Sequence, residues 1–248
     1  MNNRFVFIAP MYNASKTLAR MLHSLAGQSY ENWQLVLIDD VSDAEHKQKC
    51  IEILKQFNCY EHKIITVWND KKKWETVNVL NGIKQCNDDD IICRIDADDY
   101  LCDLDALYQF NACYEQTGCD CAWSKHRWDM SDFNISAPLK EGISVYVQPW
   151  VTSHLKTFRK QLLTNIPWEN FSNHNGDPVK RCGDQALYLP VLHQSRKNVF
   201  IPRVMYHYTI DVKPETFQTD DAKFQKMEAD FIRNRGYVAN GAPWENFV

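Results

Sequence analysis

The sequence predicts an α/β fold in which a Rossmann-like, mostly parallel central sheet carries helices on both faces. Over the first hundred residues, short apolar runs alternate with patterns typical of amphipathic helices. The apolar runs are continuous, without a polar residue at every second position, as in strands that are buried on both faces. The connections between them are short, which suits consecutive strand–helix units.

Four strands are expected in this part of the chain. They cover residues 5–10, 33–40, 63–68 and 90–96. Ligands of parallel α/β sheets bind beyond the carboxyl ends of the strands. That rule places the segments "APMYN", "DDVSD", "WNDKKK" and "DADD" along one rim of the sheet. We therefore expect the functional site at this rim.

Three amphipathic helices are expected between these strands. Their apolar stripes are Leu18, Met21, Leu22 and Leu25, then Ile51, Leu54 and Phe57, then Val77, Leu80 and Ile83. Asn13 and Ser15 are expected to cap the first helix, and Ser42 or Asp43 the second.

The alternation breaks down after Leu101. The next expected elements are a helix carrying Leu104, Leu107 and Phe110 and a strand over 121–128. A loop-like stretch over 165–184 is expected to precede a helix over 185–194 and a strand over 199–208. The chain should then end in a polar tail from Val212, with an irregular segment and a helix over 220–236. We interpret this half as a mixed extension of the same sheet.

Composition excludes several classes of protein. A net charge of −4 and a pI near 6.1 do not fit a nucleic-acid-binding surface, and the basic run "KKKW" is local. The nine cysteines follow neither a zinc pattern nor a disulfide framework, so we expect reduced thiols and a cytoplasmic protein. No apolar run approaches the ~20 residues of a membrane span, and the start of the chain does not resemble a signal peptide.

The segment "RIDADD" places three carboxylates, Asp96, Asp98 and Asp99, directly after the fourth strand. Two like charges about 4 Å apart cost roughly 4 kcal/mol at an effective dielectric constant near 20. One explanation is that Asp98 and Asp99 cap a following helix. The other is a divalent cation, Mg²⁺ or Mn²⁺, held by these carboxylates together with the phosphates of a ligand.

A second acidic pair, Asp39 and Asp40, ends the second strand. Asp43 can cap the next helix, whereas the earlier pair is placed to accept hydrogen bonds from a base or a ribose. Together with "DADD", the pattern describes a nucleotide that lies along the rim, with its base near one strand and its phosphates near another.

These motifs resemble the inverting family 2 glycosyltransferases of GT-A fold. The resemblance is carried by residues 5–107, from "VFIAPMYNASKTLARMLHSL" through "LVLIDDVSD" to "RIDADDYL". The later segments "WVTSHLKTFRKQLL" and "GDQALYLPVL" are similar to acceptor-side segments of these enzymes. The resemblance implies residues 1–107 as the nucleotide-sugar-binding half, 108–211 as the acceptor-binding and catalytic-base half, and 212–248 as a C-terminal tail.

The resemblance also implies a nucleotide-sugar donor, most simply a UDP-sugar, a glycan acceptor, and Mn²⁺ or Mg²⁺ as cofactor. The expected nucleotide-binding residues are Pro10, Tyr12, Asp39, Asp40, Asp96 and one of Lys71, Lys72 and Lys73, of which we choose Lys73. The expected metal ligands are Asp98, Asp99 and His207. The order among the three acids stays open, and a lone histidine beside tyrosines, such as His207, is more often a packed or surface residue.

In such an enzyme one carboxylate deprotonates the acceptor hydroxyl. The resemblance assigns this base to Asp184 in "CGDQAL", which an ordinary helix cap would also explain. Acceptor-binding residues are expected among Trp150, His154, Arg159 and Trp168, because tryptophan faces stack on sugar rings. His154 is a candidate for either the diphosphate or the acceptor.

Two other functions fit the sequence less well. A sugar-nucleotide nucleotidyltransferase would carry a glycine-rich, basic loop after the first strand, and "APMYNASKTL" has no glycine. A catalytically inactive carbohydrate-binding protein would not need an intact "DADD" together with Asp184.

Overall fold

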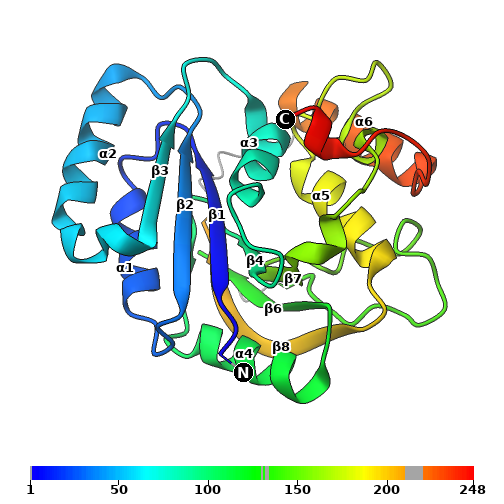
Figure 1. Cartoon of the computed structure of the whole chain (residues 1–248), viewed down its shortest axis with the longest axis horizontal. Coiled ribbons are helices and arrows are strands. Elements are labelled where there is room, and N and C mark those ends of the chain that lie inside the picture. The colour runs from blue at the N-terminus through cyan, green and yellow to red at the C-terminus, as the bar shows by residue number, and fades with distance from the viewer. Residues whose placement is uncertain (1, 130, 132–133, 210–219) are drawn as a thin grey trace.

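The computed structural model describes residues 2–129, 131, 134–209 and 220–248. Its centre is an eight-stranded sheet with the order β3-β2-β1-β4-β7-β6-β8-β5 (Figure 1). The strands are β1 (Phe5–Met11), β2 (Trp33–Asp39), β3 (Ile64–Trp68), β4 (Ile91–Arg94), β5 (Tyr100–Leu101), β6 (Cys121–Trp128), β7 (Lys156–Arg159) and β8 (Asn198–Tyr208).

The four strands β3, β2, β1 and β4 are parallel. All of them therefore end at the same rim. Along β1, Phe5 and Phe7 pack into one apolar cluster while Val6 and Ile8 pack into another. Both faces of the strand are buried, which explains the continuous apolar runs in the sequence and confirms the predicted parallel sheet.

Helices cover both faces of this sheet. The helices are α1 (Leu18–Ala26), α2 (Ala44–Gln56), α3 (Trp74–Ile83), α4 (Ala106–Thr117), α5 (Gly183–Gln194) and α6 (Asp220–Arg235). Residues of α1 and α4 belong to one apolar cluster, and residues of α3 and α5 belong to the other. Figure 1 shows α1 and α2 on the opposite side of the sheet from α3 and α5.

The second half extends the sheet with mixed strand directions. Strand β7 is antiparallel to both β4 and β6, β8 is parallel to β6, and the short β5 closes the edge against β8. This is the expected mixed extension. Helix α6 confirms the helix expected in the tail, whereas the irregular segment expected over 212–219 lies outside the described residues.

Short 3-10 turns complete the chain: η1 (Asn58–Lys63), η2 (Lys160–Leu163), η3 (Trp168–Phe171) and η5 (Trp244–Asn246). All nine cysteines are free thiols. In the described part of the chain, no helix has the length and apolar character needed to cross a membrane.

The predicted caps of the first helix were wrong. The residue at the N-cap of α1 is Thr17, because the Asn13 side chain bonds to Asp43 and the Ser15 hydroxyl bonds to His46. These side chains connect the β1–α1 loop to the start of α2. Asp43 does occupy the N-cap of α2.

Candidate active site

A cavity of about 740 Å³ lies at the rim where the parallel strands end. It is lined by Pro10, Met11, Tyr12, Asp40, Lys72, Trp74, Glu75, Asn78, Arg94, Asp96, Lys180, Arg181, Asp220, Ala222 and Gln225. We call it the donor cavity. It brings together four residues predicted for nucleotide binding, Pro10, Tyr12, Asp40 and Asp96.

The two aspartates after β2 have different surroundings. Asp40 accepts hydrogen bonds from the backbone N–H groups of Lys73 (2.7 Å) and Trp74 (3.0 Å), so it holds the loop that enters α3. Asp39 is fully buried and accepts a bond from the Ser42 backbone N–H. Asp39 does not line the donor cavity. Its hydrogen bond from Ser42 stabilises the loop after β2.

Basic and aromatic side chains form the outer wall of the donor cavity. The Lys72 ammonium lies 3.8 Å from the centre of the Tyr12 ring and 5.0 Å from that of Trp74. Tyr12 is 51% exposed, although Lys72 covers one face of its ring. The Lys73 side chain lines a neighbouring groove instead. Of the three candidate lysines, Lys72 is the one that faces the donor cavity.

The inner wall contains a buried ion network. The Arg94 guanidinium lies 2.6 Å from an Asp96 carboxylate oxygen and 2.7 Å from Oε1 of Glu75. Burial opposes a charged arginine, but the two carboxylates outweigh it and raise the pKa of Arg94 above its ordinary value. Burial raises the pKa of Glu75, and the nearby charges of Asp96 and Asp184 raise it further. Arg94 thus fixes Asp96 at the floor of the cavity.

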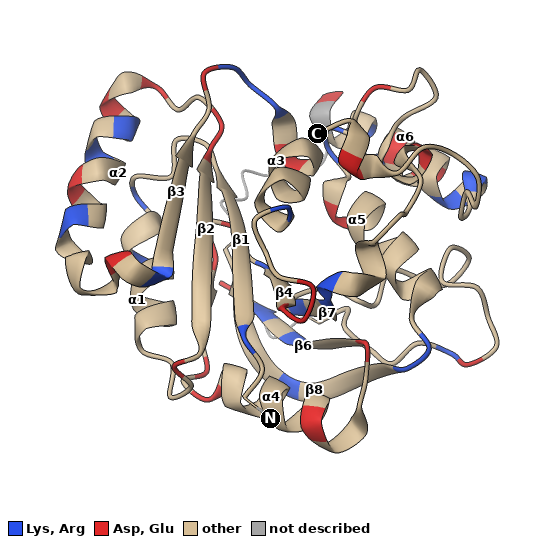
Figure 2. Cartoon of the chain, viewed as in Figure 1, with Lys and Arg blue, Asp and Glu red and all other residues tan. Residues whose placement is uncertain are grey.

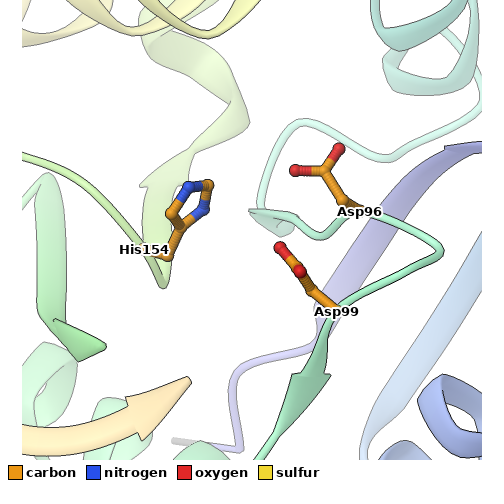
Figure 3. Close-up of side chains that lie close together, drawn as sticks. All are labelled: Asp96, Asp99 and His154. Atoms are coloured by element: carbon orange, nitrogen blue, oxygen red, sulfur yellow. The ribbon is translucent and has the colours of Figure 1, made fainter. Parts of the chain in front are cut away.

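Three potential metal ligands converge beside this network. Single ligand atoms of Asp96, Asp99 and His154 all lie within 4.8 Å of one another. Figure 3 shows both carboxylates and the imidazole pointing into the same space. Asp96 and Asp99 come from the loop after β4, and His154 comes from the segment before β7.

The environment of Asp99 penalises its charge. Asp99 is 1% exposed, and it is bonded by the Tyr206 hydroxyl (2.7 Å) and the Thr209 backbone N–H (2.7 Å). Burial, together with the charges of Asp96 and Asp98, raises the pKa of Asp99 to about 8. A cation among these groups would remove that penalty.

The surroundings of His154 favour a neutral imidazole. Its ring stacks on Tyr206 (4.7 Å between centres) and on Tyr208 (5.1 Å). Burial and the nearby Lys156 lower the pKa of His154 well below 6.5. Its Nδ1 atom is buried and has no hydrogen-bond partner in the described part of the chain. A neutral imidazole with an unused nitrogen fits a metal site.

Two residues predicted as metal ligands lie outside this cluster. The Asp98 side chain is exposed, and its backbone carbonyl accepts bonds from Arg20 and Thr209. Both ring nitrogens of His207 are engaged, Nδ1 by Arg127 (3.0 Å) and Nε2 by Asp129. His207 also stacks on Tyr100, its partner across β5 and β8. The histidine of the cluster is therefore His154 and not His207.

The predicted base, Asp184, lies in the first turn of α5. One of its oxygens lies 3.6 Å from the Lys156 ammonium, which is 2% exposed and has no hydrogen-bond partner among the described residues. Lys156 also lies 5.5 Å from the centre of the Trp150 ring. Asp184, Lys156 and Trp150 therefore form one group.

Arg159 was wrongly assigned to the acceptor site. Because β7 runs antiparallel to β4, Lys156 pairs with Arg94 at the functional rim while Arg159 pairs with Ile91 at the opposite end. The guanidinium of Arg159 bonds to the Cys119 carbonyl and lies over the Tyr114 ring.

Trp168 was also wrongly assigned to the acceptor site. It is 7% exposed, stacks on Phe247 at 5.1 Å between ring centres, and donates its indole N–H to the Gly176 carbonyl. Trp168 belongs to the apolar core.

Sequence reasoning missed Glu75, Arg94, Lys156, Lys180 and Arg181. The sequence did contain a signal for Arg94, which is a charged residue inside a continuous apolar strand. Such a residue is rarely buried without an oppositely charged partner, so a buried ion pair could have been predicted. No such signal existed for Glu75 or Lys180, because both stand in polar stretches where exposed charges are ordinary.

The comparisons with known proteins agree with this geometry. A family model described as "Glycosyl transferase family 2" matches residues 6–175. EpsE of Bacillus subtilis (strain 168), named as a glycosyltransferase, is 33% identical over 92 residues, which are 37% of this chain and 32% of EpsE. The chain thus matches about a third of the length of that relative.

Two solved structures share the fold. TarS 1–349 of S. aureus has a TM-score of 0.62 and 18% identity, with 93% of this chain and 71% of that chain covered. The mannosyltransferase PcManGT from Pyrobaculum calidifontis has a TM-score of 0.67 and 13% identity, with 98% and 67% covered. Since the family model spans more than half of the sequence, the chain belongs to glycosyltransferase family 2, and it has the GT-A fold.

Proposed function

We propose that this enzyme transfers a sugar from a nucleotide diphosphate, with inversion, to a hydroxyl group of a glycan and depends on a divalent cation. The observation that carries the proposal is the convergence of Asp96, Asp99 and His154, of which Asp96 also lines the donor cavity. Carboxylates packed this closely at a buried rim are best explained by a cation that bridges them to a diphosphate.

The residues present fit Mn²⁺ or Mg²⁺. Two carboxylates supply hard oxygen ligands, and the unpartnered Nδ1 of a neutral His154 supplies a nitrogen that favours Mn²⁺. When bound, such a cation stabilises the negative charge that develops on a leaving diphosphate. Arg94 keeps Asp96 oriented, and Tyr206 and Thr209 keep Asp99 oriented.

Asp184 is the proposed catalytic base. Its carboxylate stands at the start of α5 and would accept the proton of the attacking acceptor hydroxyl. Lys156 orients that carboxylate, and Trp150 offers an aromatic face beside it for the acceptor sugar. Residues 1–107 would thus bind the donor, and the segment 108–211 would supply the base and the acceptor side.

The nucleoside would extend from Asp96 toward Asp40, Tyr12 and Lys72. Structures of the similar TarS include complexes with UDP and with UDP-GlcNAc, and PcManGT is in complex with GDP-Man and Mn²⁺. These complexes support a nucleotide sugar as the donor, and we propose a UDP-sugar. The free thiols and the acidic composition fit a cytoplasmic location.

Isothermal titration calorimetry with UDP and GDP, each with and without Mn²⁺, tests donor binding. We expect UDP to bind in the presence of Mn²⁺ and to lose affinity without it. A screen of UDP-sugars for release of UDP then compares the wild-type enzyme with Asp184→Asn. The variant should bind the donor normally and turn over about 10³-fold more slowly. Full turnover by Asp184→Asn would remove Asp184 as the base.

A further inference from the structure

A second cavity, of about 500 Å³, adjoins the donor cavity at its outer end. Its lining residues are Lys71, Lys72, Lys73, Trp74, Val77, Asn81, Asp177, Pro178, Lys180, Phe247 and Val248. We call it the basic groove. It shares Lys72, Trp74 and Lys180 with the donor cavity, so a ligand in one can be continuous with a ligand in the other. Figure 2 shows that the loop between β3 and α3 passes from a short acidic part into a continuous basic stretch that leads to α3.

Two buried carboxylates hold the backbones of the basic segments. Asp40 accepts the backbone N–H groups of Lys73 and Trp74 on one side of the groove. On the other side Glu228 of α6 accepts those of Lys180 (3.0 Å) and Arg181 (2.7 Å). Asp40 is 6% exposed and Glu228 is 5% exposed. Both carboxylates thus fix the path of a basic segment through its backbone.

The basic side chains gather around one aromatic ring. The ammonium groups of Lys72 and Lys180 lie 5.0 and 5.6 Å from the centre of the Trp74 ring, and the Arg181 guanidinium lies 5.1 Å from it. These groups come from two segments about a hundred residues apart in the sequence. In an ordinary exposed run of lysines, no second basic segment from elsewhere in the chain would be expected to pack around the same ring.

Four lysines of the groove stand apart from the acidic side chains that the structure describes. Among the described residues, no carboxylate lies within 4.0 Å of the ammonium groups of Lys71, Lys72, Lys73 or Lys180. Asp177 is the acidic residue among those that line the groove. The whole chain carries a net charge of −4, so this cluster is a local departure from an acidic protein. Like charges held this close are stabilised when an anion binds between them.

We propose that the basic groove binds a negatively charged part of the acceptor, a phosphate or a carboxylate next to the sugar that receives the transfer. This inference rests on the proposed function, because it requires an acceptor that reaches Asp184. Lys180 and Arg181 directly precede α5, which begins with Gly183 and Asp184. A chain bound along the groove would therefore pass the catalytic base. Asp96, Asp99 and His154 do not line the groove, so the anion that it binds is distinct from the donor diphosphate.

The test uses the full chain and two anionic probes. Tripolyphosphate represents a phosphate-bearing acceptor, a galacturonic acid oligomer represents a carboxylate-bearing one, and maltoheptaose is the neutral control. Titration calorimetry should show that the wild-type protein binds at least one anionic probe and not the neutral one. The double substitution Lys71→Gln/Lys73→Gln should weaken that binding about tenfold, since two charge contacts are lost. Nucleotide affinity in the presence of Mn²⁺ should change by less than about twofold.

A matched control separates the groove from net charge. Lys16→Gln/Lys55→Gln removes the same number of lysines from exposed positions elsewhere and should bind the probe as the wild-type protein does. The proposal is overturned if neither anion binds, if both double variants bind alike, or if UDP with Mn²⁺ displaces the probe. Failure of UDP to bind the wild-type protein is a separate result, which would contradict the proposed function and not the anion site.

Discussion

Arg94 is the residue on which the inner wall of the donor cavity depends. It stands between Glu75 and Asp96, and removing it would leave two carboxylates facing each other with no cation between them. Removing one partner of a buried ion pair typically costs 3–5 kcal/mol. We expect Arg94→Met to lower the free energy of unfolding by about 3 kcal/mol in urea denaturation.

A second substitution isolates the cause. In the double variant Arg94→Met/Glu75→Gln, the uncompensated charge of Glu75 is gone, so part of the loss should be recovered. A single variant that costs less than about 1 kcal/mol, or a double variant that is additive, would show that the network does not stabilise the fold.

At the scale of elements, the contact between α3 and α5 determines where the proposed base stands. Gly183 opens α5, and a Cβ atom at this position would lie 2.8 Å from Cδ of Glu75 and 3.0 Å from Oγ1 of Thr76. Glu75 cannot move aside freely because Arg94 holds it. Gly183→Ala should therefore push α5 away from α3 and displace Asp184.

We expect Gly183→Ala to cost about 1–3 kcal/mol in thermal or urea unfolding and to lower turnover more than donor binding. Gly27→Ala is the control, because Gly27 has a negative φ of −83° and its added Cβ would meet nothing closer than 3.2 Å. Equal effects of the two substitutions on turnover would show that the α3–α5 contact does not position the base.

The elements also show what the sequence could predict. The strands and helices up to Ile83 follow from apolar periodicity, because each is a local pattern, and the rim of the parallel strands follows from their common direction. The direction of β7 is not local information. Because β7 runs antiparallel to β4, Arg159 lies at the opposite end of the sheet from the functional rim. His154, which stands just before β7, lies at that rim. Likewise, the residues around His207 in the sequence allow a role as a metal ligand. In the structure, His207 pairs with Tyr100 across β5 and β8, and its ring nitrogens contact Arg127 and Asp129.

At the scale of the whole molecule, a buried histidine should make stability fall in acid. His126 is 2% exposed, and burial together with Lys156 lowers its pKa from 6.5 to about 4. Above pH 6.5 the histidine is neutral in both the folded and the unfolded chain. Between pH 6.5 and pH 4 only the unfolded chain binds the proton, so stability is lost progressively as the pH falls through this window.

The difference between those two pKa values corresponds to about 3 kcal/mol, of which about 2 kcal/mol should be lost by pH 4.5. Urea unfolding at pH 7 and pH 4.5 measures this loss. In His126→Gln the loss between the two pH values should be smaller by about that amount, whatever the stability at pH 7. An identical pH dependence of the two proteins would rule out His126 as the source.

The central claim is that Asp96, Asp99 and His154 hold a divalent cation next to the donor diphosphate. Electron paramagnetic resonance of Mn²⁺, titrated into the protein with UDP present, tests it without an activity assay. We expect one bound Mn²⁺ per chain, an affinity at least about 100-fold lower in Asp99→Asn and in His154→Ala, and little change in His207→Ala. Tight Mn²⁺ binding that survives both Asp99→Asn and His154→Ala, or that is lost only in His207→Ala, would contradict the account.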